Sequence, residues 1–334
     1  MTILVGTTVC NVLFGDSTRK LAVDAGALSV LKVIATTEFE ELRESTARVI
    51  MILVDDKWLQ SRLINEPVVS ILVYVLEDAK DSTWSLECAV KAFSCFAKQA
   101  IFRSTLIEKG CIAAFVGAII NGRVTTITVA EEICRCLCLL SYENELVGIM
   151  LSNHILVALY CIYKGNLCDS ACANMMAITL RNLSGNIEII HRPLDINGRP
   201  ETGRNRDTFE KLSVPATRLE VKACESIVKQ EGFRVLGWIL RDFHVNNLQL
   251  YRSTAMILHN LCKVPELHDT LIEQGFMDIV RTVVVAAGHL VQDEYEDDDE
   301  YIDSEDATAT ATGTGTGNTT NSNSPSRTRA NTIT

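Results

Sequence analysis

Small and apolar residues follow one nine-residue pattern repeatedly along the chain. The pattern has a small residue, two variable positions, an apolar pair, and then two positions before a bulky apolar residue. This spacing puts the apolar side chains on one face of an α-helix, whereas a strand would alternate them. The copies lie at residues 5–13, 47–55, 89–97, 130–138, 176–184 and 254–262. The pattern therefore predicts a series of related helices.

The seventh position of each copy sets the period of the repeat. These positions are Asn11, Leu53, Cys95, Cys136, Asn182 and Asn260, separated by 42, 42, 41, 46 and 78 residues. The last interval equals one period plus an insertion of about 36 residues. A second landmark, a small or turn-forming residue before an apolar run, occurs at Gly26, Pro67, Gly110, His154, Gly232 and Gly275. Gly or Pro at this point is expected to end one short helix and turn the chain into the next.

These phased motifs resemble the armadillo repeat. In that family a unit of about 42 residues forms three helices, with Gly before the second helix and an Asn-Leu pair near the end of the third. The resemblance covers residues 1–292 and implies an all-α armadillo-type solenoid, a right-handed superhelix of about six three-helix repeats. HEAT repeats, which are the nearest alternative, lack this glycine turn.

Three segments depart from the repeat. Residue 1 falls inside an expected third helix, so we expect a truncated first repeat and a chain that is a fragment of a longer protein. Residues 187–216 hold three of the six prolines and are predicted to be an exposed loop inserted between repeats. Residues 293–334 form an acidic and then Thr/Gly/Ser/Asn-rich tail, which is predicted to be disordered. A second hypothesis is that this tail binds the chain's own groove or the Arg-bearing insertion as an acidic pseudo-ligand.

Charge is distributed unevenly over the chain. The net charge is −11, but residues 293–334 alone carry ten acidic and two basic side chains. The remaining 292 residues are close to neutral and do not create the positive field that a nucleic-acid-binding protein needs. We therefore expect no nucleic-acid partner.

The twelve cysteines lie within apolar helical stretches. Together with the absence of a convincing secretory signal, they indicate free thiols in a reducing compartment, with the cytoplasm expected and the nucleus as a second location. Cys134, Cys136 and Cys138 alternate, so on a helix neighbouring members of this set point about 200° apart. They cannot converge on one metal ion, and we expect structural thiols; by analogy with the repeat, Cys136 should face the groove. No uncharged run reaches the roughly 18 residues of a membrane span.

Catalytic and cofactor motifs are not recognisable. GTGTG at 313–317 lies in low-complexity sequence without a strand before it or a helix after it, so it does not indicate a phosphate-binding loop. The six histidines form no ligand set. We expect no enzymatic activity, no cofactor, no metal and no small-molecule substrate.

The resemblance implies that an extended or helical peptide binds along the concave surface of the third helices. The candidate contact residues are Asn174, Arg181, Asn182, Arg252, His259, Asn260, Lys91 and Arg135. An Asn amide can clamp a peptide backbone with a donor and an acceptor, and Arg can bind carboxylate or phosphate at two points. The alternative role of Asn182 and Asn260 is to tie neighbouring repeats together.

The expected function is a protein–protein interaction scaffold or adaptor. Importin-α-like transport adaptors carry a Trp four residues before the groove Asn, and none stands at Thr7, Val49, Lys91, Glu132, Ile178 or Met256. The tryptophans Trp58, Trp84 and Trp238 are instead expected to pack in helix interfaces. Three alternatives stay open: a transport adaptor with a degenerate groove, the armadillo region of a larger enzyme or ubiquitin ligase, and a membrane-tethered scaffold whose N-terminal lipidation signal is missing here.

Overall fold

The computed structural model describes residues 2–65, 67–78, 82–185, 217–230, 232–243 and 247–286. The chain divides into two units, Met1–Ala286 and Ala287–Thr334. The predicted loop at 187–216 and the predicted tail at 293–334 lie outside the described residues, so both stay predictions.

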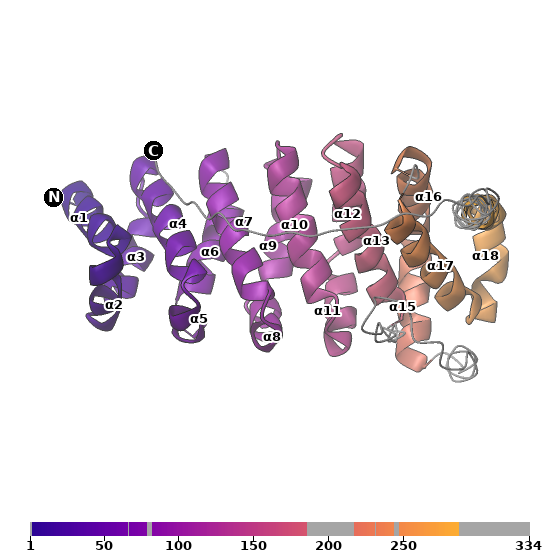
Figure 1. The fold of residues 1–334 in the computed structure, drawn as a ribbon, viewed down its shortest axis with the longest axis horizontal. Helices are drawn as coiled ribbons and strands as arrows, with labels where there is room; N and C mark the ends of the chain where they lie inside the picture. The colour runs from indigo at the N-terminus through magenta and orange to yellow at the C-terminus, as the bar shows by residue number, and fades with distance from the viewer. Residues whose placement is uncertain are drawn as a thin grey trace, which may run out of the picture. The chain divides into compact units, whose positions relative to one another are not determined.

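The described part of the first unit consists of helices joined by short turns, and the repeat places them in sets of three (Figure 1). The first helices of the sets are α2 (Asp16–Asp24), α5 (Lys57–Leu63), α8 (Ala100–Glu108), α11 (Val147–Ser152), α15 (Arg218–Lys229) and α18 (His268–Glu273). The second helices are α3 (Ala27–Ala35), α6 (Val68–Glu77), α9 (Cys111–Ile120), α12 (Ile155–Lys164), α16 (Gly232–Phe243) and residues 276–286. The third helices are α1 (Thr2–Phe14), α4 (Glu40–Asp55), α7 (Thr83–Ala97), α10 (Ile127–Leu140), α13 (Ser170–Ser184) and α17 (Leu248–Cys262). Short 3-10 turns, Asn144–Leu146 and Pro265–Leu267, precede α11 and α18.

Helices of one kind stack on their counterparts in the next repeat. Each third helix contacts the following third helix, and each second helix contacts the following second helix up to α16 (Figure 1). The stacking continues across the insertion, because α13 packs directly on α17 and α12 on α16. This arrangement confirms the all-α armadillo-type solenoid expected from the sequence.

In four repeats the turn before the second helix uses the left-handed backbone region, whereas Pro67, before α6, has a φ of −67°. Gly26, Gly110 and Gly275 have φ values of 87°, 87° and 90°. This conformation strains residues with a Cβ, which explains why glycine stands at these positions. His154 adopts the same conformation, with φ of 59°, although it is not glycine.

In four repeats, a side chain of the first helix forms a hydrogen bond with the C-terminal end of the third helix. A side chain on or beside the first helix bonds to a carbonyl oxygen six residues earlier, at the C-terminal end of the third helix. The pairs are Arg19 Nε to Leu13 O (3.3 Å), Gln60 Nε2 to Val54 O (2.6 Å), Arg103 Nε to Ala97 O (2.9 Å) and His268 Nε2 to Cys262 O (3.0 Å). These bonds satisfy carbonyl groups that the helix itself leaves unpaired.

This bonding pattern corrects the register of two repeats. The equivalent carbonyl residues are Leu13, Val54, Ala97 and Cys262, and Ser141 and Ser184 take the same place at the ends of α10 and α13. The residues two places before these helix ends are therefore equivalent to one another. They are Asn11, Ile52, Cys95, Leu139, Asn182 and Asn260. The register predicted from Leu53 and Cys136 is therefore wrong, by one and by three residues. Most residues of 133–140 are small or apolar, so the nine-residue motif can be placed on α10 in two registers.

Two of the three tryptophans also differ from expectation. Trp58 and Trp84 are 66% and 46% exposed rather than packed between helices. The Lys20 ammonium lies 3.9 Å from the ring centre of Trp58, where a cation–π contact replaces burial. Trp238 does pack between helices, stacked on Tyr163 of α12 with ring centres 5.7 Å apart.

Among the described helices, none is by itself long and apolar enough to cross a membrane. The pair Asn144–Ser152 and Ile155–Lys164 reaches that length and apolarity together, with a bend of 66° between its parts. Five apolar residues of α12 are part of the core, because Ile155, Leu156, Ala158, Leu159 and Ile162 are fully buried.

Candidate peptide-binding groove

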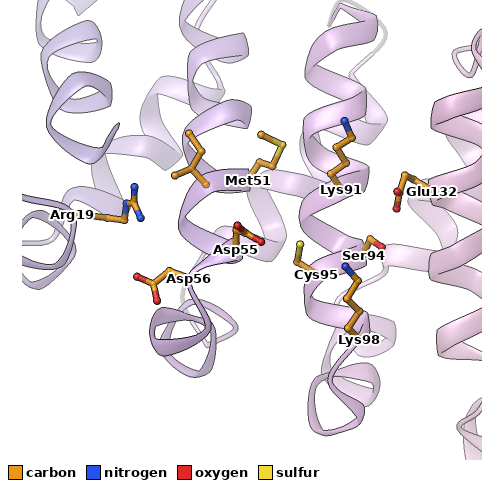
Figure 2. Close-up of a pocket in the computed structure, with 10 residues that line it drawn as sticks. Arg19, Met51, Asp55, Asp56, Lys91, Ser94, Cys95, Lys98 and Glu132 are labelled. Carbon is orange, nitrogen blue, oxygen red and sulfur yellow. The ribbon is translucent and has the colours of Figure 1, made fainter. Parts of the chain in front are cut away.

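A hollow of about 660 Å³ opens on the third helices in the N-terminal half of the array (Figure 2). Three consecutive third helices, α4, α7 and α10, contribute to its lining, together with Arg19 of α2. The lining residues are Arg19, Met51, Ile52, Asp55, Asp56, Lys91, Ser94, Cys95, Lys98 and Glu132. Three of them are basic and three acidic, so the hollow is charged but balanced.

The corrected register arranges this surface in rows that cross the third helices. One row is acidic (Glu44, Glu87, Glu131), the next is basic (Arg48, Lys91, Arg135), and the third is largely apolar (Ile52, Cys95, Leu139). Successive rows are four residues apart, about one helical turn, so each row lies beside the next. All nine residues are half-buried or exposed. The rows present a repeated chemistry to whatever lies across the helices.

Two members of the basic row are paired within their own helices. Lys91 Nζ lies 2.5 Å from Glu87 Oε1, and Arg135 Nη2 lies 2.6 Å from Glu131 Oε1. The hydrogen bond to Glu87 is the main cause of the raised pKa of Lys91, so its ammonium keeps its charge. Such i,i+4 pairs are worth only about 0.3–0.5 kcal/mol at a solvated surface, so an incoming charged group can replace either partner.

The acidic and basic rows change composition in the C-terminal half of the array. At the places of the acidic row stand Asn174 and Arg252, and at those of the basic row Ile178 and Met256. Arg252 is exposed, while Asn174 and His259 are half-buried. The Oδ1 atom of Asn174 is buried and has no hydrogen-bond partner among the described residues. A buried acceptor left unpaired is costly, so rotation of this side chain toward a ligand donor would be stabilising.

Asn182 and Asn260 are buried, with 2% and 3% exposure. Asn182 Nδ2 donates to Ser141 Oγ at 2.9 Å, and Asn260 Nδ2 donates to Ser184 Oγ at 2.9 Å. Both bonds join one repeat to the preceding repeat. The structure therefore places these two amides in the inter-repeat role that the sequence left as an alternative.

Arg181 supports the same bond network. It is 9% exposed, and its Nε and Nη2 atoms donate to Asn182 Oδ1 at 3.2 and 2.9 Å. This guanidinium orients the amide of Asn182 rather than pointing freely into the groove. Of the predicted contact residues, Lys91, Arg135, Asn174, Arg252 and His259 retain some exposure on the third helices.

The expectation that Cys136 faces the groove is wrong. Its thiol is fully buried, and its Sγ lies 3.8 Å from Val90 O of α7. The corrected register explains this, because the equivalent residues Val49, Ala92, Thr179 and Ile257 are also buried. Cys134 and Cys138 are buried as expected, and burial raises the pKa of Cys138 to about 11.

All twelve cysteines are free thiols. Within the residues that the structure describes, no group of three or more His, Cys, Asp or Glu side chains is arranged to hold a metal ion.

Sequence reasoning missed most of the residues that line the hollow. Arg19, Met51 and Asp55 were not predicted, and Arg48, which belongs to the basic row beside the hollow, was hidden by the misplaced register of α4. A detectable signal was present, because a Glu stands four residues before a basic side chain in three successive third helices. Aligning helices by their capping residues would have revealed it.

The fold has counterparts among solved structures. No family model matches the chain, and no curated protein matches it. A designed armadillo repeat protein in complex with the peptide (KR)4 aligns over 77% of this chain and 91% of its own, with 16% identity and a TM-score of 0.51.

Two further structures align equally well. Computationally designed armadillo repeat proteins for modular peptide recognition align over 77% of this chain and 90% of theirs, at 16% identity and a TM-score of 0.51. An engineered protein aligns over 77% and 88%, at 17% identity and the same TM-score. At this level of sequence identity, the similarity shows only that the folds are alike. The described unit of this chain has the armadillo repeat fold.

Proposed function

We propose that this chain is a non-catalytic scaffold or adaptor that holds an extended or helical segment of a partner protein across its third helices. The observation that carries the proposal is the open hollow over α4, α7 and α10, with its acidic, basic and apolar rows. A groove that repeats one chemistry from helix to helix suits a ligand that repeats along its own length, as a polypeptide does. Two of the structural counterparts are described by their peptide complexes or peptide recognition, which supports the same reading.

The rows indicate which partner segment would fit. Neighbouring helices pack about 8–10 Å apart, and an extended chain rises about 3.3 Å per residue, so one repeat spans about three ligand residues. A partner that carries side chains of both charges at this spacing could replace the intrahelical pairs of Lys91 and Arg135. Apolar side chains of the partner would lie against Ile52, Cys95 and Leu139.

The C-terminal half would contribute a backbone contact. Asn174 offers an unpaired buried acceptor, and Arg252 offers an exposed guanidinium beside it on the next third helix. An amide N–H of a bound segment would reach Asn174 Oδ1 after the side chain turns toward the groove. We propose that Asn182, Asn260 and Arg181 act indirectly, by holding α10, α13 and α17 in register.

The importin-α-like alternative requires tryptophans in the groove, and the corrected register changes which positions they would occupy. Four residues before Asn11 and its equivalents stand Thr7, Arg48, Lys91, Arg135, Ile178 and Met256, and none is tryptophan. This composition still disfavours an importin-α-like transport adaptor. A cytoplasmic location remains our proposal, supported by twelve thiols that are free in the structure.

The test is a selection of binding peptides by the full chain from a random library, followed by affinity measurements on the best binder. The groove variant carries Lys91→Ala and Arg135→Ala, at half-buried positions whose loss leaves the core intact. Each lost charge-assisted hydrogen bond is worth about 1.5–3 kcal/mol, so we expect the affinity to fall at least tenfold.

The matched control carries Lys32→Ala and Arg281→Ala, which remove the same charges from exposed positions on second helices. This control should bind like the wild type. Equal binding by the groove variant and the control would remove the third helices from the interface and refute the proposal.

A further inference from the structure

Charges of opposite sign follow one another along the hollow over α4, α7 and α10 (Figure 2). Arg19, which bonds to the end of α1, lies at one side of the hollow, and Asp55 at the end of α4 comes next. Lys98 at the end of α7 follows, and Glu132 of α10 lies at the other side. The sign of the charge therefore changes from one third helix to the next, in the order positive, negative, positive, negative.

The two central charges occupy equivalent positions of neighbouring third helices. Asp55 directly follows Val54, and Lys98 directly follows Ala97, whose carbonyl groups accept the hydrogen bonds from the first helices. Both charged side chains are exposed. Neither has an ion-pair partner among the residues that the structure describes. These two charges can therefore pair with a ligand without breaking a contact within the chain.

The thiol of Cys95 lies within the field of three of these charges. Burial is the main cause of its raised pKa; the Lys98 ammonium lowers this pKa, whereas the carboxylates of Asp55 and Glu132 raise it further. Cys95 is half-buried and lines the hollow. The carboxylates of α4 and α10 therefore lie on either side of the ammonium of α7, close enough to act on one point.

The two outer charges are positioned by bonds to their own neighbourhood. Arg19 donates from Nε to Leu13 O at 3.3 Å and from Nη2 to Phe14 O at 3.5 Å. The Glu132 Oε2 atom lies 3.4 Å from Arg135 Nε, in a pair that is partly exposed. A guanidinium has five N–H donors and a carboxylate has two acceptor oxygens, so each group can share its bonds with a ligand.

The spacing of the charges favours one conformation of the ligand. Neighbouring helices pack about 8–10 Å apart. A polyproline II segment rises about 3.1 Å per residue with three residues per turn, so every third side chain faces the same side about 9 Å further on. In a β-strand, residues three apart point to opposite faces. A polyproline II segment therefore presents one side chain of a given face to each repeat.

We propose that the hollow binds a polyproline II segment of a partner protein in which acidic and basic residues alternate at every third position. The acidic residues pair with Arg19 and Lys98. The basic residues pair with Asp55 and Glu132. This inference rests on the proposed function and names the class of partner segment. A segment with charges of one sign would meet like charge at two of the four positions, which lowers its affinity.

The test uses the full chain and two synthetic peptides of identical composition. The matched peptide is Glu-Pro-Ala-Lys-Pro-Ala-Glu-Pro-Ala-Lys, in which prolines favour the polyproline II conformation. The rearranged peptide is Glu-Pro-Ala-Glu-Pro-Ala-Lys-Pro-Ala-Lys. Fluorescence anisotropy at low ionic strength measures both affinities. We expect the matched peptide to bind about tenfold tighter, because two ion pairs become like-charge contacts in the other complex, and we expect salt to reduce the difference.

Exchange of the two central charges of the protein should reverse this preference. The double variant Asp55→Lys with Lys98→Glu has the order positive, positive, negative, negative, which complements the rearranged peptide. Both positions are exposed, so circular dichroism should show unchanged helicity. The matched control, Lys32→Glu with Asp278→Lys, exchanges the same charges at exposed positions of second helices and should keep the wild-type preference. Equal affinity of the wild type for both peptides, or an unreversed preference in the double variant, would overturn the proposal.

Two further probes test the charge order and the conformation separately. A peptide of residues 293–306, DEYEDDDEYIDSED, has no basic residue and should bind more weakly than the matched peptide. Tighter binding would overturn the charge order in favour of the chain's own acidic segment. A helical peptide with the same alternating charges at every seventh residue, about 10.5 Å apart, should bind no better than its rearranged form. A clear advantage would overturn the polyproline II conformation.

Failure of this inference can be told apart from failure of the proposed function. A peptide selected from the random library that binds through Lys91 and Arg135 without alternating charges would overturn the inference and leave the proposed function standing. If neither the selected peptides nor the matched peptide binds the full chain, both are refuted.

Discussion

At the residue scale, the asparagines near the ends of third helices join repeats. Asn260→Ala would leave the Ser184 hydroxyl and the Gly185 carbonyl, both buried, without this donor. We expect a loss of about 1–3 kcal/mol in the free energy of unfolding, measured by urea denaturation. Asn11→Ala is the matched control, because Asn11 holds the equivalent place but is exposed. A loss of similar size in both variants would contradict the inter-repeat role.

The thiols should also differ in reactivity, because burial raises the pKa of most of them. The values reach about 11 for Cys88 and about 12 for Cys168 and Cys224, so at neutral pH these groups stay protonated and unreactive. Cys262 is the one exposed cysteine of the twelve. We expect an alkylating reagent near neutral pH to modify Cys262 first, as read by mass spectrometry. Early labelling of Cys111 or Cys136 would show that the core opens locally.

At the element scale, substitutions in the turn before the second helix can either lower or raise the stability of the protein. A Cβ added at Gly110 would meet nothing within 4 Å, so the cost of Gly110→Ala comes only from its φ of 87°. We expect a loss of about 1–2 kcal/mol. His154→Gly should relieve the corresponding strain and stabilise the protein by up to about 1 kcal/mol. Thermal unfolding of the two variants, relative to the wild type, measures both effects; shifts in the same direction would refute this account of the turn.

At the scale of the whole molecule, the array continues across the insertion. α13 and α17 pack directly, and a Cβ built on Gly185 would lie 3.3 Å from Glu220 Oε1 of α15, so the two ends of the interrupted segment are close. Replacing residues 187–216 with about six Gly and Ser residues should therefore preserve the fold. The shorter loop should add roughly 1 kcal/mol of stability by loop entropy, measured as a higher urea midpoint. A large loss of helicity would mean that the segment itself holds the repeats together.

The sequence by itself determined the helical class, the period and the number of third helices, because helical spacing and glycine turns are local properties of the chain. It also identified Lys91, Arg135, Asn174 and Arg252 as third-helix residues with some exposure. The structure decided the register of α4 and α10, because their apolar residues satisfy the motif in more than one phase and packing selects one of them. It also separated the buried amides of Asn182 and Asn260 from the exposed rows beside them. That separation depends on the neighbouring repeat: an asparagine is a groove residue or a bond between repeats according to whether a serine of the preceding helix lies within 3 Å of its amide.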